Sequence, residues 1–272
     1  MDPSLFDISG KTVIITGGSG VLGGSMAQYL LLNGAQVAII GRTPEKVEAK
    51  MVALKKVTSK VMGFTGDVLD LKFLKKVKSG IVEKWGNIDV LINAAGGNMP
   101  GATIGENQNI FDLSVDDFRG VSELNLDGTV IPSLVFGKHM ANQGSGCIIN
   151  ISSMTATQAV SRVVGYSASK AAIDNFTRWM ATELAQKFGD GIRMNAIAPG
   201  FFISEQNKRL LLQVDNSLTE RGKAIISKTP MKRFGKTNEL NGTVHWLISD
   251  AASFVTGAII PIDGGFSAFS GV

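Results

Sequence analysis

Tyr166 and Lys170 are the residues whose types and spacing point most directly to a reaction. They begin and end the motif Tyr-Ser-Ala-Ser-Lys, and a spacing of four places both side chains on one face of a helix. A tyrosine hydroxyl is a weak acid at neutral pH, but a nearby ammonium favours the phenolate and brings its pKa toward the working range. The pair predicts proton transfer by Tyr166, although a Tyr-x-x-x-Lys motif by itself is more often structural.

Two serines, Ser152 and Ser153, directly follow the apolar run 147–151. A hydroxyl at Ser153 can hydrogen-bond a carbonyl oxygen, where negative charge grows as hydride adds to the carbon. With Tyr166 and Lys170 it completes the groups needed to interconvert a carbonyl and an alcohol with a nicotinamide cofactor. The alternative is that both serines belong to an ordinary loop after a strand.

A glycine-rich turn follows the first apolar run, 12–15, and precedes a helical pattern. Its sequence, Thr-Gly-Gly-Ser-Gly-Val-Leu-Gly at 16–23, allows backbone amides to approach a pyrophosphate at a helix N-terminus. Gly18, Gly20 and Gly23 also have the G-x-G-x-x-G spacing. That pattern alone also fits a plain turn, and its place between a strand and a helix is what favours a dinucleotide.

Arg42 lies where a dinucleotide fold selects between NAD and NADP, after the second apolar run in Ile40-Gly41-Arg42. No carboxylate there would repel a 2′-phosphate, and the guanidinium could bind one through two hydrogen bonds. The alternative is an ordinary solvated arginine. The residues favour NADP(H) and leave NAD(H) open.

The elements that must position these residues alternate along the chain. Short apolar runs at 12–16, 36–40, 61–64, 90–93, 147–151, 193–198 and 258–262 alternate with amphipathic stretches at 22–33, 44–56, 71–85, 115–143, 168–188 and 238–249. This rhythm predicts an α/β fold: a doubly wound parallel sheet of about seven strands with helices on both faces. No linker or repeat divides the chain, so we expect one domain over 1–272.

Two segments exceed ordinary loop lengths, and long loops in compact domains tend to be functional. Residues 97–112 are rich in glycine and asparagine, and residues 201–229 carry a helical pattern of their own. We expect the second segment to be a lid over the substrate.

Composition excludes several other classes. The 27 basic and 23 acidic residues give a net charge of +4 without a dense basic run, so no nucleic-acid partner is expected. The single cysteine, Cys147, sits in an apolar run and cannot form an internal disulfide. Two histidines and one cysteine offer no metal-ligand cluster. Neither a leader nor an 18-residue apolar span is evident, so we expect a cytoplasmic protein without a membrane partner.

Over essentially its whole length the sequence resembles the short-chain dehydrogenase/reductase family, whose motifs occur here in the family's order. They are the glycine turn at 16–23, the adenine-contacting segment 66–68, the turn 93–96, Asn125 in Leu-Asn-Leu-Asp-Gly, Ser153 thirteen residues before Tyr166, and the Pro-Gly segment 195–200. Two positions depart from the pattern: Val21 replaces a glycine and Ala94 replaces a second asparagine.

The resemblance implies a role for each catalytic residue. Tyr166 is the general acid and base, Lys170 binds the nicotinamide ribose and lowers the tyrosine pKa, Ser153 orients the carbonyl, and Asn125 holds a water in a proton relay. We expect the cofactor to contact Gly17, Gly18, Ser19, Gly20, Val21, Leu22, Arg42, Asp67, Val68, Asn93, Ala94, Ala95, Gly96, Tyr166, Lys170, Pro199, Gly200, Phe202 and Ser204.

The segments 96–98, 197–206, 229–231 and 261–272 are similar to the sugar-acid branch of this family, the D-mannonate oxidoreductases or fructuronate reductases. This implies reversible reduction of D-fructuronate to D-mannonate, a cofactor more often NAD, and a homotetramer built on the helices that contain Asn125 and Tyr166. A polyhydroxylated carboxylate needs a cation and several polar partners. The expected substrate contacts are Asn98, Ser153, Arg162, Gln206, Asn207 and Lys208, with Arg209 beside them; Lys208 and Arg209 could instead be exposed charges on the lid.

Other functions remain open on the sequence. A related reductase could act on gluconate-type substrates, other polyols or acyl thioesters, although the polar segment after Gly97 argues against an acyl groove. A dinucleotide sensor without turnover is the third possibility, because a fold does not fix a function. The presence of all four catalytic residues argues against a sensor.

Overall fold

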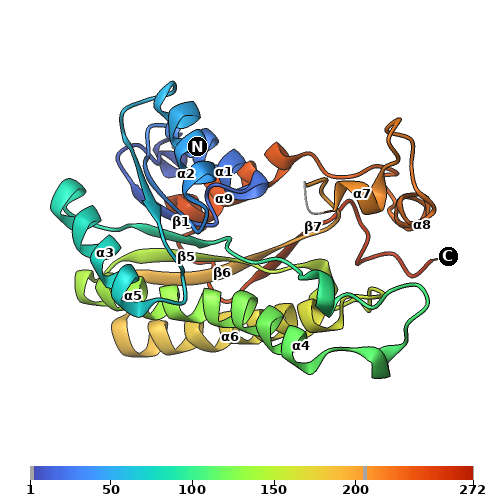
Figure 1. The fold of residues 1–272 in the computed structure, drawn as a ribbon. Helices are drawn as coiled ribbons and strands as arrows, with labels where there is room; N and C mark the ends of the chain where they lie inside the picture. The colour runs from blue at the N-terminus through green and yellow to red at the C-terminus, as the bar shows by residue number, and fades with distance from the viewer. Residues whose placement is uncertain (1–2, 205–206, 272) are drawn as a thin grey trace.

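The protein is a single seven-stranded parallel sheet between two layers of helices, as the alternating pattern predicts (Figure 1). The structure, a computed structural model, describes residues 3–204 and 207–271. The strands are β1 (Thr12–Thr16), β2 (Gln36–Gly41), β3 (Val61–Thr65), β4 (Val90–Asn93), β5 (Gly146–Ile151), β6 (Ile192–Pro199) and β7 (Ile259–Ile262). Every predicted strand is present, and the bounds differ by no more than one residue at either end.

The strand order is β3-β2-β1-β4-β5-β6-β7, and every neighbouring pair is parallel. The chain winds outward in one direction from β1 to β3 and then crosses back to place β4 on the other side of β1. Open α/β sheets bind ligands at the carboxyl ends of their strands, where this reversal leaves a crevice. In this protein the strand order reverses between β1 and β4, so we expect a ligand at that point.

Helices cover both faces of the sheet. The first layer holds α1 (Val21–Leu32), α2 (Pro44–Lys55) and α9 (Asn241–Ile248), and the second holds α3 (Leu71–Trp85), α5 (Gly128–Gln143) and α6 (Val164–Phe188) (Figure 1). The short helix α4 (Val115–Ser122) leads into α5 and also packs on α6.

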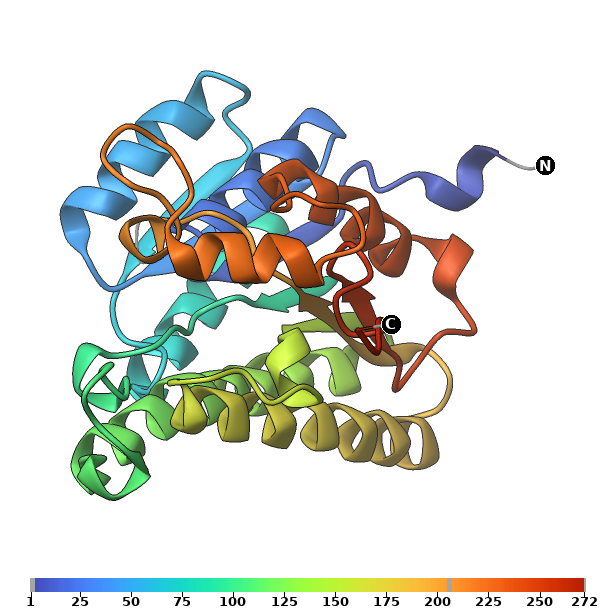
Figure 2. The same cartoon turned by 90° about the vertical axis from the view of Figure 1, so that its right-hand side faces the viewer.

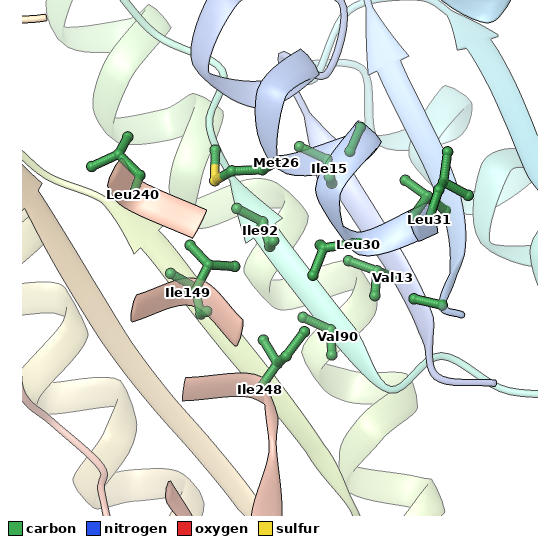
Figure 3. Packing of buried hydrophobic residues seen from close by; sticks show 14 of the residues in the cluster. Val13, Ile15, Met26, Leu30, Leu31, Val90, Ile92, Ile149, Leu240 and Ile248 are labelled. Atoms are coloured by element: carbon green, nitrogen blue, oxygen red, sulfur yellow. The ribbon is translucent and has the colours of Figure 1, made fainter. Parts of the chain in front are cut away.

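Alternation along the strands builds a core on each face. On β1, Val13 and Ile15 point toward α1, where Leu30 packs near them (Figure 3). Ile14, between them, points to the other face and joins the cluster under α3, α5 and α6. All three strand residues are completely buried. A strand buried on both faces has to be apolar throughout, which is why the runs are continuous rather than alternating.

Three expected helices differ in their limits. The stretch 115–143 is not one helix: a π-helical turn, Glu123–Asp127, separates α4 from α5. The helix expected at 168 begins at Val164, and the one expected at 238 begins as a 3-10 turn, Thr237–Leu240, before α9. Part of the segment 201–229 folds into α7 (Lys208–Leu211) and α8 (Glu220–Lys228). Figure 2 shows α8, in orange, lying across the end of the molecule where the strands terminate.

Candidate active site

Tyr166 and Lys170 lie in the first two turns of α6 and share one face, as their spacing predicts. The Lys170 ammonium nitrogen is 5.3 Å from the centroid of the Tyr166 ring. The Ser153 side chain, just beyond the end of β5, is hydrogen-bonded to that of Tyr166. The structure thus brings these three residues together, and Asn125 also lies near Lys170, because a Cβ at Gly96 would lie 2.7 Å from Asn125 Oδ1 and 3.5 Å from Lys170 Nζ.

Burial dominates the electrostatics of this cluster. It raises the pKa of the Tyr166 hydroxyl, and the hydrogen bond with Ser153 opposes that rise. The sequence argument predicted a tyrosine pKa lowered by Lys170, so in the ligand-free site the net direction is the opposite. Burial also lowers the pKa of Lys170 to about 8, while the Asp174 carboxylate opposes this change. Lys170 nevertheless remains mainly protonated at pH 7.

The Lys170 ammonium bonds the end of β5 and is influenced by the Asp174 carboxylate. Its Nζ donates to the carbonyl oxygen of Ile151 at 2.7 Å. One turn further along α6, the Asp174 carboxylate accepts a 2.5 Å hydrogen bond from the Ser152 hydroxyl. Ser152 and Asp174 are both buried. Asp174 was not among the residues predicted from the sequence, although it continues the spacing of four that links Tyr166 and Lys170.

Asn125 lies at the centre of the π-helical turn and is fully buried. Its amide nitrogen donates to the carbonyls of Gly97 at 2.7 Å and Val121 at 2.8 Å, and its Oδ1 accepts from the Gly97 amide at 3.1 Å. π-helical turns are rare and often occur at functional sites. Asn125 therefore ties the start of the segment 97–112 to the helix below it.

The glycine turn is packed so closely that it has no room for side chains at Gly17 and Gly23. Gly17 has φ +66°, and a Cβ atom there would lie 2.6 Å from the Ala94 carbonyl oxygen. A Cβ at Gly23 would lie 2.5 Å from the Gly17 carbonyl oxygen. α1 starts at Val21 with Gly20 as a cap that provides no side-chain hydrogen bond, so its first amides remain available to an anion. Ser19 and Leu22 belong to the same turn and first helical residues.

The expected adenosine-side residues follow β2 and β3. Arg42 is exposed directly after β2, and Asp67 accepts a hydrogen bond from the Leu69 amide in the turn after β3. Val68 is buried against the second helical layer. The Gly66 amide donates to the Gly41 carbonyl, which keeps the two strand ends together. A nucleotide bound there would lie beside the Arg42 guanidinium.

The turn after β4 faces the glycine turn with its backbone. The amides of Ala94 and Ala95 both donate to the Thr16 hydroxyl at 3.1 Å. The Asn93 side chain turns away into the helical layer, where it donates to Ser133 and Asn150. Only the backbone of Asn93 is therefore placed to contact a cofactor. Gly96 has φ +155°, and a Cβ there would lie 2.7 Å from Asn125 Oδ1.

The segment after β6 lies against the end of β7. The Gly200 amide donates to the Ile262 carbonyl, and a Cβ at Gly200 would lie 2.7 Å from the Asp263 Cα, so the contact after Pro199 requires glycine. The Phe202 side chain is buried against Gly235 in the core. The predicted nicotinamide contact would therefore involve the backbone of Phe202 and the partly exposed Ser204.

The expected substrate residues divide into two groups. Asn98 and Arg162 are partly buried near the catalytic cluster, and the buried Asn98 Oδ1 accepts no hydrogen bond from any residue that the structure describes. By contrast, the Asn207 amide bonds the backbone of Phe202 and Ser204. Lys208 and Arg209 are exposed, as the alternative interpretation had it, and Gln206 lies outside the described residues.

The known proteins to which this chain is similar are oxidoreductases. A family model described as enoyl-(acyl carrier protein) reductase matches residues 19–267. The chain is 44% identical to the oxidoreductase UxuB of Bacillus subtilis, with the full length of both proteins covered. It is 30% identical to gluconate 5-dehydrogenase of Gluconobacter oxydans, over 97% of this chain and 98% of that protein.

Among solved structures, the chain resembles a Haemophilus influenzae protein described as a candidate D-mannonate oxidoreductase with bound NAD. The two are 39% identical, with a TM-score of 0.90 and 98% of each chain covered. None of the helices in 3–204 and 207–271 is both long and apolar enough to cross a membrane, and those residues contain no group of three His, Cys, Asp or Glu suited to a metal ion.

Proposed function

This chain belongs to the short-chain dehydrogenase/reductase family of NAD(P)-dependent oxidoreductases, and we propose that it reversibly reduces a keto sugar acid, with D-fructuronate and D-mannonate as the substrate pair. The observation that carries this proposal is the placement of a cation, Arg162, four residues before the proton-transferring Tyr166. Such an arrangement provides one group for the carbonyl and another for the carboxylate of the same small molecule. The similarity to proteins named for D-mannonate and gluconate supports it.

In the reductive direction, Tyr166 gives its proton to the carbonyl oxygen while Ser153 donates a hydrogen bond to the same oxygen. A bound nicotinamide cofactor supplies the hydride. The raised pKa of Tyr166 keeps the hydroxyl protonated and ready to act as an acid. The Lys170 ammonium, 5.3 Å from the tyrosine ring, stabilises the phenolate that remains. In oxidation the same residues act in the opposite sense.

Asn125 acts on this cluster through the backbone. Both hydrogens of its amide nitrogen are used, one on Gly97 and one on Val121, which leaves only a lone pair of Oδ1 for a water molecule. We assign it to holding the turn at Gly96 and Gly97 against the catalytic cluster. Any water in a proton relay would donate to Oδ1.

The decisive experiment follows oxidation of NADH and NADPH in separate reactions with D-fructuronate, using the wild type and Tyr166→Phe. Sustained turnover in the wild type that is lost in the variant supports the proposal, provided that the variant still binds the cofactor. Turnover with a panel of polyols or keto acids, but not with D-fructuronate or D-mannonate, would overturn the substrate assignment.

We propose that both dinucleotides bind and that Arg42 contacts the 2′-phosphate of NADP(H). The residue is exposed at the carboxyl end of β2, and no carboxylate lies within 4.0 Å of it in the described part of the chain. Arg42→Ala should raise KM for NADPH about 10-fold or more, the value of one charge-assisted hydrogen bond, and leave KM for NADH unchanged. No change in either KM would show that Arg42 is only a surface residue, and an equal rise in both would show that it contacts a part of the cofactor other than the 2′-phosphate.

A second candidate is a gluconate-type polyol dehydrogenase, favoured by the similarity to gluconate 5-dehydrogenase. Because the chain also matches the family of enoyl-(acyl carrier protein) reductases, an enoyl thioester is a further compound to test. The two classes differ in the bond reduced, because a saturated hydroxy acid cannot be an enoyl substrate. Comparing D-gluconate, D-mannonate and a crotonyl thioester in one assay separates them.

We also propose that the chain forms a homotetramer through α5 and α6. A groove between these helices is lined by Leu126, Asp127, Val130, Ala172, Asn175, Phe176 and Trp179. Trp179 is 62% exposed and Leu134 on α5 is 55% exposed, which is unusual for large apolar side chains unless a partner covers them. A monomer by light scattering would overturn this assignment.

A further inference from the structure

Arg221, on α8, is a partly buried cation without a carboxylate partner. Within the part of the chain that the structure describes, its guanidinium donates only to Ser161, to the hydroxyl at 3.2 Å and to the carbonyl at 3.4 Å. No Asp or Glu among residues 3–204 and 207–271 lies within 4.0 Å of it. A buried or half-buried arginine in a folded protein is normally paired with an anion.

Arg221 contacts Ser161, the residue directly before a second arginine, Arg162. Burial and the positive charge of Arg162 both lower the pKa of Arg221. Two guanidinium groups held near each other repel, and an anion bound to both would remove that repulsion. The pair is therefore suited to a ligand that carries negative charge.

Arg162 is fixed in an unusual backbone conformation. It has φ +77°, which is rare outside glycine, asparagine and aspartate and which tends to occur at functional sites. Its Nε donates to the Ile104 carbonyl at 2.7 Å, and its own carbonyl accepts from the Ile104 amide at 3.0 Å. These bonds hold the rest of the guanidinium in one direction. Its only carboxylate contact among the described residues is Glu106, at 3.8 Å and 88% exposed.

The two arginines come from two different segments, the loop before α6 and the helix α8, which meet where Arg221 bonds Ser161. Arg162 lies just before α6 and four residues before Tyr166, and Ile104 beside it belongs to the segment that Asn125 holds at Gly97. Arg221 comes from α8, which crosses the carboxyl end of the sheet in Figure 2. Because Arg221 bonds Ser161, the lid helix is joined to the same loop that ends at the catalytic tyrosine.

We propose that Arg162 and Arg221 together form a carboxylate-binding subsite of the active site, with Arg221 the contribution of the lid. A carboxylate can accept paired hydrogen bonds from each planar guanidinium. The exposed Glu106 is the resting counterion of Arg162, which a bound sugar acid displaces. This inference deepens the proposed function, since it assigns the residues that make a hydroxy acid a better ligand than a neutral polyol.

The test measures binding separately from turnover. D-Mannonate is titrated calorimetrically into the full-length enzyme saturated with NADH, a pair that cannot react, for the wild type, Arg221→Ala and Lys223→Ala. Lys223 is the matched control, because it lies on the same helix and pairs only with the neighbouring Glu220. Arg221→Ala should weaken D-mannonate binding 10-fold or more, while Lys223→Ala should change it less than 2-fold. Affinity for NADH should stay constant in both.

Arg162 needs a second variant because it also holds Ile104. Arg162→Lys keeps the positive charge but loses the planar donor pair, so it should weaken D-mannonate binding without lowering the midpoint of thermal unfolding by more than a few degrees. The double variant Arg162→Lys/Arg221→Ala should lose less than the product of the single effects, because both residues serve one carboxylate.

The outcomes separate this inference from the proposed function. Equal losses in Arg221→Ala and Lys223→Ala, or a wild type that binds neither D-mannonate nor D-gluconate, would overturn the arginine subsite. A wild type that binds D-mannonate through Arg221 but does not oxidise it would keep the subsite and overturn the proposed substrate pair.

Discussion

The Lys170 ammonium donates a 2.7 Å hydrogen bond to the carbonyl of Ile151, the last residue of β5. This bond joins the catalytic helix to the strand that is followed by Ser152 and Ser153. Lys170 is only 3% exposed, so the position is defined by its surroundings as well as by the bond. Activity should therefore require an ammonium at this position, and the surrounding residues leave no room for a larger cation.

Lys170→Met should therefore lower kcat at least 100-fold, and Lys170→Arg should not restore it. Methionine removes the charge that stabilises the Tyr166 phenolate, while the larger guanidinium does not fit where the ammonium is buried. Loss of the bond leaves the Ile151 carbonyl unpaired and should cost about 1–3 kcal/mol of stability at pH 10, where the lysine no longer carries the penalty of a buried charge. Steady-state kinetics and urea unfolding measure the two effects, and an arginine variant with the wild-type rate would contradict the argument.

The same lysine gives a pH dependence of stability. Its pKa of about 8 in the folded protein lies below its usual value of 10.5, so the unfolded chain binds more protons between these pH values. The contribution of Lys170 to the free energy of unfolding must then rise as the pH increases from 8 to 10.5, and it is lowest below pH 8. At 1.36 kcal/mol per pKa unit the rise is about 3 kcal/mol.

Other groups also titrate between pH 8 and 10.5. The effect of Lys170 is therefore the difference in the free energy of unfolding between the wild type and a variant without this lysine. Urea unfolding of the ligand-free wild type and of Lys170→Met at pH 7, 8, 9 and 10 should show the wild type gaining relative to the variant as the pH rises. Parallel curves would mean that Lys170 titrates near its usual pKa and is not affected by burial.

The features that could be predicted from the sequence are those marked by a pattern of neighbouring residues. β1 and its glycine turn follow from a continuous apolar run and a fixed glycine spacing, and Tyr166 and Lys170 follow from a spacing of four. The π-helical turn at Asn125 was not predictable, because no residue propensity marks it and it depends on contacts with Gly97. The upward pKa shift of Tyr166 was also missed, since burial is a property of the packed molecule.

Arg221 was missed for a different reason. Its contact with Ser161 joins positions 60 residues apart, and nothing in the segment 201–229 distinguishes it from the exposed Lys208 and Arg209. Lys208 and Arg209 were expected from the sequence either to contact the substrate or to be exposed charges on the lid, and they are exposed. Only the placement of α8 over the loop before α6 shows which of the lid cations turns inward.

Gly17 and Gly10 provide a matched test of the dinucleotide turn. Both have positive φ, +66° and +77°, but a Cβ at Gly17 would lie 2.6 Å from the Ala94 carbonyl oxygen, whereas a Cβ at Gly10 would meet no atom within 4 Å. Gly10→Ala should cost about 1–2 kcal/mol from backbone strain alone. Gly17→Ala should cost more and should weaken NAD⁺ binding at least 10-fold.

Fluorescence titration of NAD⁺ and thermal unfolding distinguish the two glycine variants. If Gly17→Ala loses stability but binds NAD⁺ as tightly as Gly10→Ala does, the turn at 16–23 does not contact the cofactor. The dinucleotide would then have to bind elsewhere along the carboxyl edge of the sheet.

Asn125→Ala should loosen the start of the segment 97–112 and lower kcat/KM by about 10- to 100-fold. The substitution removes three hydrogen bonds, two to the backbone of Gly97 and one to Val121, and leaves those buried groups unpaired at about 1–3 kcal/mol each. Hydrogen exchange of the peptides that cover 97–112 should become faster.

The control is Asn109→Ala, an exposed asparagine in the same segment whose side chain accepts from the Phe111 amide. It should speed exchange only near residue 111 and leave kcat/KM unchanged. If both variants lower kcat/KM equally, general order in the segment matters for turnover, and the specific link from Asn125 to Gly97 does not.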